Sequence, residues 1–216
     1  MNYVAELIYH IAEFSGVFAF GVSGAMIAID RKLDLFGVVF MGVTTALGGG
    51  VVRDLMLGIV PPSMFRSYSY LLISVAASLL VFAAALYFRK FYAQNSEKIE
   101  KITKIVDAIG LGLFSVFGAR TAIECGYGDN VFFCMFLGMT TGSVGGLLRD
   151  VMTGSVPAVL RKRIYAVASL GGAGLYCLLI RLGLHETYSM LTAALCVFAV
   201  RMLATKYKWN FPTAQK

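Results

Sequence analysis

Long apolar stretches dominate the chain, and seven of them approach the length of a membrane-spanning helix. Four hold no Asp, Glu, Lys or Arg: 35–52, 67–88, 131–148 and 164–180. Three are shorter or interrupted: 14–29, which extends back to residue 7 if Glu13 is tolerated; 105–123, which contains Asp107 and Arg120; and 187–200, which continues to 203 past Arg201. A helix needs about 20 residues to cross roughly 30 Å of hydrocarbon. Because these runs are continuous rather than alternating, they predict seven transmembrane helices and an all-α integral membrane protein.

The composition supports this prediction. Hydrophobic residues make up 58% of the 216 residues and charged residues 14%, whereas soluble domains are about half apolar and about a quarter charged. The four cysteines lie far apart in or beside apolar runs, so they predict no disulfide framework. His10 and His185 are isolated, so we expect neither a metal nor a cofactor. The chain has no room for a soluble catalytic domain and no His-Ser-Asp constellation, so we do not expect an enzyme.

The basic residues divide unevenly between the two sides of a seven-helix protein. One side carries Arg53, Arg66 and Arg181. The other carries fifteen: Arg31, Lys32, Arg89, Lys90, Lys98, Lys101, Lys104, Arg149, Arg161, Lys162, Arg163, Arg201, Lys206, Lys208 and Lys216. The positive-inside rule then predicts an N-terminus outside and a C-terminus in the cytoplasm. We therefore expect a multi-pass protein of the cell (inner) membrane. The net charge of +7 reflects this topology and predicts no nucleic-acid binding.

Membrane lipids are the expected surroundings of this chain. Aromatic side chains flank the apolar runs, as an interfacial aromatic belt would: Tyr68, Tyr70, Tyr87, Phe88, Tyr165, Tyr207 and Trp209. The longest polar stretch, 94–104, indicates a solvated cytoplasmic face near anionic head groups, with a specific lipid site as the alternative. We predict a first three-helix unit over 1–90, a cytoplasmic linker over 91–104, a second unit over 105–182, and a seventh helix with a cytoplasmic tail over 183–216.

An internal repeat joins the two predicted units. Residues 40–61 read FMGVTTALGGGVVRDLMLGIVP, and residues 136–157 read FLGMTTGSVGGLLRDVMTGSVP. The copies lie 96 residues apart, and each falls on the second helix of a three-helix unit. Because three is odd, the second unit must enter the membrane from the opposite side. The sequence therefore predicts two inverted three-helix repeats plus a seventh helix, as in many transporters.

Glycines in the repeat have two interpretations. Gly42, Ala46 and Gly50 recur every four residues, as do Gly138, Gly142 and Gly146, which favours close helix packing. The runs also weaken the helix by about 1 kcal/mol for each glycine and invite a kink or break, which is tolerated beside a water-filled cavity. The residues concerned are Gly48, Gly49 and Gly50 in the first copy and Gly145 and Gly146 in the second.

Charged pairs follow both glycine runs. Arg53 and Asp54 are adjacent, as are Arg149 and Asp150. Neighbours on a helix do not face one another, so we expect neither pair to neutralise itself. Such residues either cap helix ends at the interface or line a polar pathway.

Further polar residues are candidates for the same pathway. Thr44, Thr45, Thr140 and Thr141 either add hydroxyls to it or bond back to their own helices. Arg120 either pairs with Glu124 at i+4 or places a charge in the conduit.

The doubled GGxxRD element, with Pro61 and Pro157 seven residues after each Asp, resembles the prokaryotic branch of the trimeric intracellular cation channel family. The segments 21–25 (GVSGA) and 34–37 (DLFG) carry the same resemblance, which covers about 14–203. It implies a homotrimer in which each protomer has its own hydrophilic pore, bounded by kinked second and fifth helices, and permeation that prefers potassium. Bacterial members have also been classed as glycine transporters. One departure is Ser143-Val144 in place of Leu47-Gly48.

Two functional hypotheses remain open on the sequence. The first is a monovalent-cation channel, in which carbonyls freed by a broken helix, together with Asp54 and Asp150, favour a cation. The second is a small amino-acid carrier, in which an arginine binds the carboxylate of a zwitterion and an aspartate binds its ammonium group. The resemblance implies that the pore of the channel lies at the second and fifth membrane helices, whereas the carrier would bind its substrate at an Arg-Asp pair near a broken helix.

Overall fold

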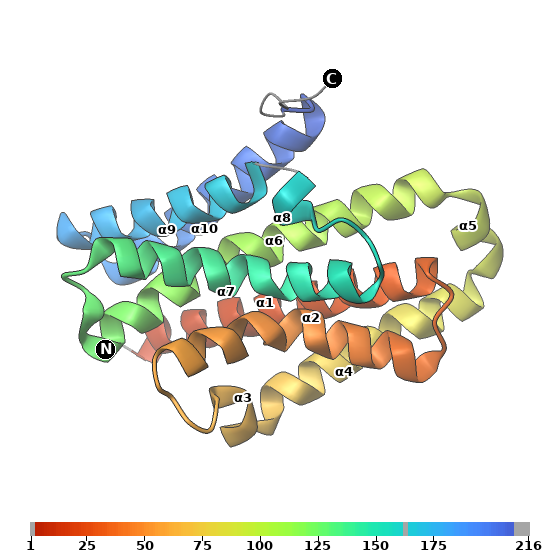
Figure 1. Cartoon of the computed structure of the whole chain (residues 1–216), viewed down its shortest axis with the longest axis horizontal. Coiled ribbons are helices and arrows are strands. Elements are labelled where there is room, and N and C mark those ends of the chain that lie inside the picture. The colour runs from red at the N-terminus through yellow and green to blue at the C-terminus, as the bar shows by residue number, and fades with distance from the viewer. Residues whose placement is uncertain (1–2, 162–163, 210–216) are drawn as a thin grey trace.

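The computed structural model describes residues 3–161 and 164–209, and it is a bundle of long helices (Figure 1). Within these residues, seven helices are long and apolar enough to cross a membrane. Their bounds are α1 Tyr3–Asp30, α2 Leu35–Met56, α4 Tyr68–Tyr87, α6 Ser96–Ala122, α7 Val131–Met152, α9 Ile164–Arg181 and α10 Glu186–Lys206. Short helices occupy the connections: α3 Ser63–Arg66, α5 Arg89–Gln94, the π-helix η1 Ile123–Tyr127 and α8 Ala158–Arg161. The prediction of an all-α membrane protein with seven spans is confirmed.

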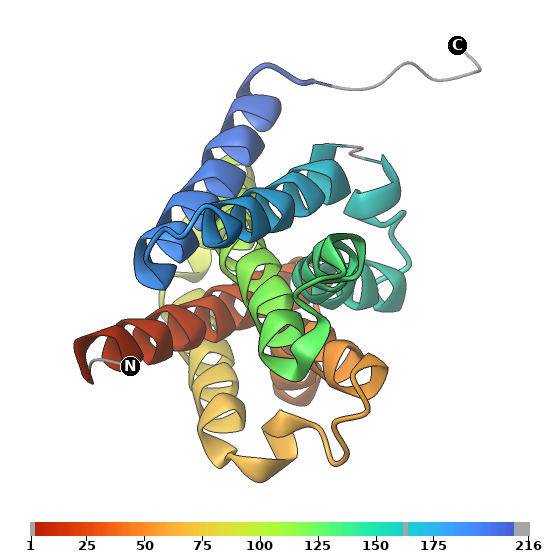
Figure 2. The same ribbon diagram turned by 90° about the vertical axis from the view of Figure 1, so that its left-hand side faces the viewer.

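Two inverted three-helix units, α1-α2-α4 and α6-α7-α9, form the body of the bundle, and α10 packs against α6 and α9. Figure 2 shows the units from one end. Figure 1 places the described N-terminus and the α6–α7 and α9–α10 turns at one end of the bundle. The α1–α2 and α7–α8 connections lie at the other. We call these the Arg53 end and the Arg149 end, after the charged pair that lies toward each.

The starts and ends of α2 and α7 follow the repeat. The Asp34 carboxylate accepts the backbone N–H of Gly37 at 2.8 Å, and the Asn130 side chain accepts that of Phe133 at 3.0 Å. A side chain in this position satisfies an N–H that has no partner inside the helix. Each helix ends before a glycine with positive φ, Gly58 at 71° and Gly154 at 64°, a backbone conformation that glycine adopts without a steric penalty. All four positions are related by 96 residues.

Small residues also let the first and second helices of each unit approach closely. A Cβ on Gly24 of α1 would overlap Thr45 and the Met41 carbonyl oxygen of α2. In the second unit a Cβ on Gly118 of α6 would overlap Thr141 and the Leu137 carbonyl oxygen of α7. The two units therefore use the same packing at matched positions.

Two predictions about residues near the helix ends differ from the structure. Residues 96–104 are the first turns of α6 rather than a polar loop, since charges such as Glu100 and Lys104 pair at 2.5 Å along the helix. Tyr165 is not interfacial but 1% exposed, because its face of α9 meets other helices. Lys162, Arg163 and Lys216, three of the charges counted for topology, lie outside the described residues.

The glycine-rich segment of α9, residues 171–174, packs mainly against other helices of the same chain. Gly172 lies against Val197 of α10, and Gly174 lies against Met135 of α7. Only Gly171 faces open space. This segment therefore offers little smooth surface for contacts between protomers.

Candidate functional site

The glycine runs do not break their helices. α2 is helical from Leu35 to Met56 and α7 from Val131 to Met152, so the expected break at Gly48, Gly49 and Gly50, and the weaker one at Gly145 and Gly146, is wrong. A glycine weakens a helix by about 1 kcal/mol, but contacts with a neighbouring helix compensate for that. The carbonyls that a break would have freed therefore keep their helical partners.

Close packing between α2 and α7 explains the central glycines. A Cβ on Gly49 would overlap the carbonyl oxygen of Thr141, and a Cβ on Gly145 would overlap the carbonyl oxygen of Thr45. Gly48 faces the Leu148 side chain. The packing interpretation holds for these residues, and they set how closely the two helices cross.

Three of the four candidate threonines bond to their own helices. The Thr45 hydroxyl donates to the Met41 carbonyl at 2.7 Å, and the Thr141 hydroxyl donates to the Leu137 carbonyl at 2.6 Å. Thr140 does the same toward Phe136 at 2.8 Å. Thr44 is partly buried. The hydroxyls of Thr45, Thr140 and Thr141 therefore have hydrogen-bond partners within their own helices.

Each adjacent Arg-Asp pair is an ion pair, contrary to our expectation. Arg53 Nη2 lies 2.7 Å from Asp54 Oδ1, and Arg149 Nε lies 3.0 Å from Asp150 Oδ1. Adjacent residues on a helix point in different directions, but the arginine side chain is long enough to reach the carboxylate of the next residue. All four residues are buried.

The second oxygen of each aspartate holds the following connection. Asp54 Oδ2 accepts the backbone N–H of Ser63 at 2.7 Å, and Asp150 Oδ2 accepts that of Ala158 at 2.7 Å. Both donors lie at the first residue of a short helix, α3 and α8. Each aspartate thus binds its arginine and fixes the chain that leaves the helix.

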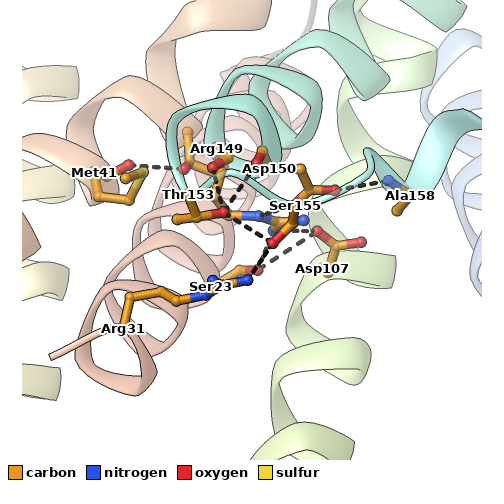
Figure 3. A network of polar contacts seen from close by, with 10 residues as sticks. Ser23, Arg31, Met41, Asp107, Arg149, Asp150, Thr153, Ser155 and Ala158 are labelled. Atoms are coloured by element: carbon orange, nitrogen blue, oxygen red, sulfur yellow. Dashed lines mark hydrogen bonds and ion pairs between the residues drawn. The ribbon is translucent and has the colours of Figure 1, made fainter.

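At the Arg149 end the arginine enters a further network, shown in Figure 3. Arg149 Nη1 donates to Asp107 Oδ1 at 2.7 Å and to the Ser23 hydroxyl at 2.7 Å. Arg149 is 3% exposed and Asp107 is 6% exposed. Nearby, Arg31 donates to the Ser155 hydroxyl and joins the α1–α2 turn to the α7–α8 turn. The sequence showed Asp107 as a charge inside an apolar stretch, and that signal could have placed it in the site.

At the Arg53 end a small cavity lies beside the arginine. Glu13 of α1 stands 94 residues before Asp107 and is its counterpart in the first unit. A cavity of about 40 Å³ lies among Glu13, Arg53, Asp54, Ser63 and Tyr70, with apolar side chains completing it. Among the described residues, Glu13 forms no ion pair with Arg53. A buried water needs about 10–15 Å³, so this space is large enough for a few waters or one small ion.

The two ends differ in what lies beside the matched glycines Gly50 and Gly146. A Cβ on Gly146 would meet the Tyr165 hydroxyl at 3.1 Å and Arg149 Nη2 at 3.5 Å. A Cβ on the matched Gly50 would meet only Arg53, at 3.9 Å. The space filled by a tyrosine hydroxyl at the Arg149 end is therefore open at the Arg53 end.

Arg120 lies in a separate cluster near the Arg53 end. It is 2.7 Å from Glu124 and 2.7 Å from Glu186 of α10, and its guanidinium stacks 3.9 Å over the Tyr9 ring. The ion-pair interpretation is confirmed, with Glu186 as an additional partner that the sequence did not suggest. A recess of about 400 Å³ adjoins Arg120, Glu124 and Glu186.

Comparison with known proteins assigns the chain to a family. A family model described as glycine transporter matches residues 10–85 and 104–181. The chain belongs to the glycine transporter family. The two matched ranges fall on the two three-helix units and include both Arg-Asp pairs, Glu13 and Asp107. α10 lies wholly outside them.

Relatives of this glycine transporter family member include a UPF0126 membrane protein of Deinococcus radiodurans, 37% identical over 79% of this chain and 75% of the relative. The chain is also similar to the crystal structure of a prokaryotic TRIC channel in 0.5 M KCl. The identity there is 34%, the TM-score is 0.85, and the match covers 95% of this chain and 100% of the other. For a TRIC trimeric intracellular cation channel orthologue from Rhodobacter sphaeroides the identity is 29% and the TM-score 0.83, over 94% and 99% of the chains.

Proposed function

We propose that this protein is a cation channel that passes monovalent cations, potassium in preference, and assembles as a homotrimer. The observation that carries the proposal is the match to a prokaryotic TRIC channel over the whole of that chain, at 34% identity and a TM-score of 0.85. The trimer rests on the name of the Rhodobacter sphaeroides relative, a trimeric cation channel. Seven apolar helices place each protomer among membrane lipids.

The proposed path runs within each protomer, along α2 and α7, between the cavity at Arg53 and the network at Arg149. Buried ionisable groups in a membrane protein usually line such a route, because charge is costly elsewhere in the hydrocarbon. At the Arg53 end Glu13 and Asp54 supply two negative charges against one arginine. Since α2 and α7 touch through Gly49 and Gly145, conduction requires these two helices to separate at their crossing.

The orientation that we propose has the N-terminus outside the cell and the C-terminus in the cytoplasm of the inner membrane. The bias of fifteen basic residues against three supports it. The cavity beside Arg53 then opens toward the outer side, and the packed Arg149 network lies on the cytoplasmic side.

A second candidate function is the transport of glycine or another small zwitterion. The description of the matching family favours it, and so does the cavity beside Arg53 and Glu13. There the guanidinium suits a carboxylate, and the Glu13 carboxylate suits an ammonium group. A charge-assisted hydrogen bond of this kind contributes roughly 1.5–3 kcal/mol, so two of them suffice for a weak binding site.

Flux measurements on purified protein in liposomes separate the two candidates. We expect discrete potassium currents in planar bilayers and no saturable uptake of labelled glycine by the same preparation. Potassium currents that survive in Arg53→Gln support the channel, because removing a positive charge does not remove a cation's binding partner. Absence of currents, with saturable glycine uptake that Arg53→Gln weakens at least about tenfold, would establish the carrier instead.

A further inference from the structure

Arg201 on α10 is a buried cation with no carboxylate partner among the described residues. Its exposed fraction is 5%, and its guanidinium lies 4.6 Å from the centre of the Tyr165 ring. Arg201 Nε has no hydrogen-bond partner, and neither has the Tyr165 hydroxyl. A buried charge without an ion pair is costly. Stacking on an aromatic ring offsets only part of that cost.

Tyr165 connects Arg201 to the network at the Arg149 end. Its hydroxyl lies beside the position of Gly146 and near Arg149, and the charges that act on it are those of Asp107, Arg149 and Arg201. Arg201 therefore stands at the end of the proposed path, on the far side of one aromatic ring from the Arg149–Asp107 ion pair.

Arg201 makes the buried charge at the Arg149 end of the path less negative than the charge at the Arg53 end. At the Arg149 end, Asp107 and Asp150 are balanced by Arg149 and Arg201, which gives a total of zero.

At the Arg53 end, the cavity is lined by Glu13, Asp54 and Arg53, whose formal charges total −1. Tyr70 lines the same cavity. The neighbouring cluster of Arg120, Glu124 and Glu186 adds a further −1. Arg201, the additional buried cation at the Arg149 end, comes from α10, which belongs to neither repeat.

A purely structural role for Arg201 explains these observations less well. An apolar residue of similar volume would fill the same space without the desolvation cost, and such replacements of buried ions are often neutral or stabilising. A fixed guanidinium near a conduction path instead has a definite electrostatic effect, because it repels cations and raises the barrier that they cross.

We propose that Arg201 sets the barrier for cations at the Arg149 end of the path, and that its charge makes permeation asymmetric between the two ends. This inference rests on the proposed cation channel. Cations are attracted to the negative cavity at the Arg53 end and are opposed by Arg201 at the other end. The residue thus limits conductance and sets the direction of rectification without contacting the ion.

The test is single-channel recording of the purified full chain in planar bilayers, with potassium chloride on both sides. The variants are Arg201→Gln and Arg201→Met, which remove the charge, and Arg201→Lys, which keeps it. Lys206→Gln is the matched control, because it removes one positive charge from an exposed position on the same helix. Two neutral variants are used so that one remains informative if the other does not fold, as judged by size-exclusion chromatography.

We expect both neutral variants to raise potassium conductance about three- to tenfold and to make the current–voltage relation more nearly symmetric. Arg201→Lys and Lys206→Gln should stay within about twofold of the parent protein. Unchanged rectification and conductance in folded Arg201→Gln or Arg201→Met, while the parent conducts, would overturn the inference and leave the channel standing. A parent protein that passes no cation current overturns both.

Discussion

The backbone of Gly49 in α2 lies directly against the Thr141 carbonyl oxygen of α7, and Gly145 meets the Thr45 carbonyl in the same way. Each helix thus contributes one glycine and one carbonyl to the crossing. Contacts of this kind between a glycine Cα and a carbonyl oxygen recur where membrane helices approach closely. The glycines therefore allow α2 and α7 to approach one another this closely.

Replacing either crossing glycine with alanine should destabilise the protein. A methyl group at Gly49 or Gly145 overlaps backbone that cannot move away, and overpacking of this kind costs about 1–3 kcal/mol. Thermal unfolding in detergent measures the loss. Gly171→Ala is the control, since nothing lies within 4 Å of the added atom. Full stability of Gly49→Ala together with lost flux would mean that the glycines act on conduction rather than on packing.

Loss of the arginine should matter more at the Arg149 end than at the Arg53 end. Arg149→Gln leaves Asp107 buried without its cation, which costs about 3–5 kcal/mol, whereas Arg53→Gln removes an ion pair to Asp54 alone. Unfolding midpoints of the two variants give the comparison.

A double variant tests whether the buried Asp107 charge is the cause. Asp107→Asn added to Arg149→Gln removes that charge and should restore part of the stability, since residues in contact do not contribute additively. Strictly additive losses would show that the pair is not coupled.

Neutralising Glu13 should reduce cation conductance at low salt. The change removes one of the two carboxylate charges that line the cavity at the Arg53 end, so the local concentration of cations falls. We expect a decrease of about fivefold in bilayers at low ionic strength, shrinking as salt screens the field. Glu6→Gln, an exposed carboxylate earlier on α1, should have little effect. Equal effects of the two substitutions would remove Glu13 from the proposed path.

The native thiol of Cys125 and a cysteine introduced at Ser96 lie at opposite ends of the bundle and can report the orientation in cells. Cys125 is exposed beside the α6–α7 turn, and Ser96 is exposed at the start of α6. In a background with Cys196→Ser, a membrane-impermeant maleimide should label Cys125 from outside. With Cys125→Ser and Ser96→Cys, labelling should require opened cells. The reverse pattern would invert the proposed topology.

The sequence was sufficient for the spans and the repeat because both depend on local information. Run length fixes α2 and α7, and the matched caps Asp34 and Asn130 set where they begin. The glycine break was predicted wrongly because helix propensity is local, whereas the contact that compensates Gly49 comes from Thr141, 92 residues away.

Burial of individual polar residues was equally out of reach of the sequence. Arg201 resembled one more cytoplasmic charge, and Tyr165 resembled an interfacial aromatic residue. Both are buried because one face of α10 packs on α9, and a single chain's hydropathy does not specify that face. Asp107 is the exception, since a carboxylate inside an apolar span is a signal from which an internal partner could have been predicted.

α10, the helix without a repeat partner, makes the two ends of the molecule different. An antiparallel pair of identical three-helix units could build the crossing of α2 and α7, since each half supplies the same glycine, carbonyl, arginine and aspartate. The two ends of such a pair would be equivalent, so both of its orientations in the membrane would be the same. α10 contacts the second unit much more than the first. It brings the guanidinium of Arg201 to the Arg149 end only. In the proposed channel, the 21 residues of α10 therefore add an asymmetry between the two ends that neither repeat supplies.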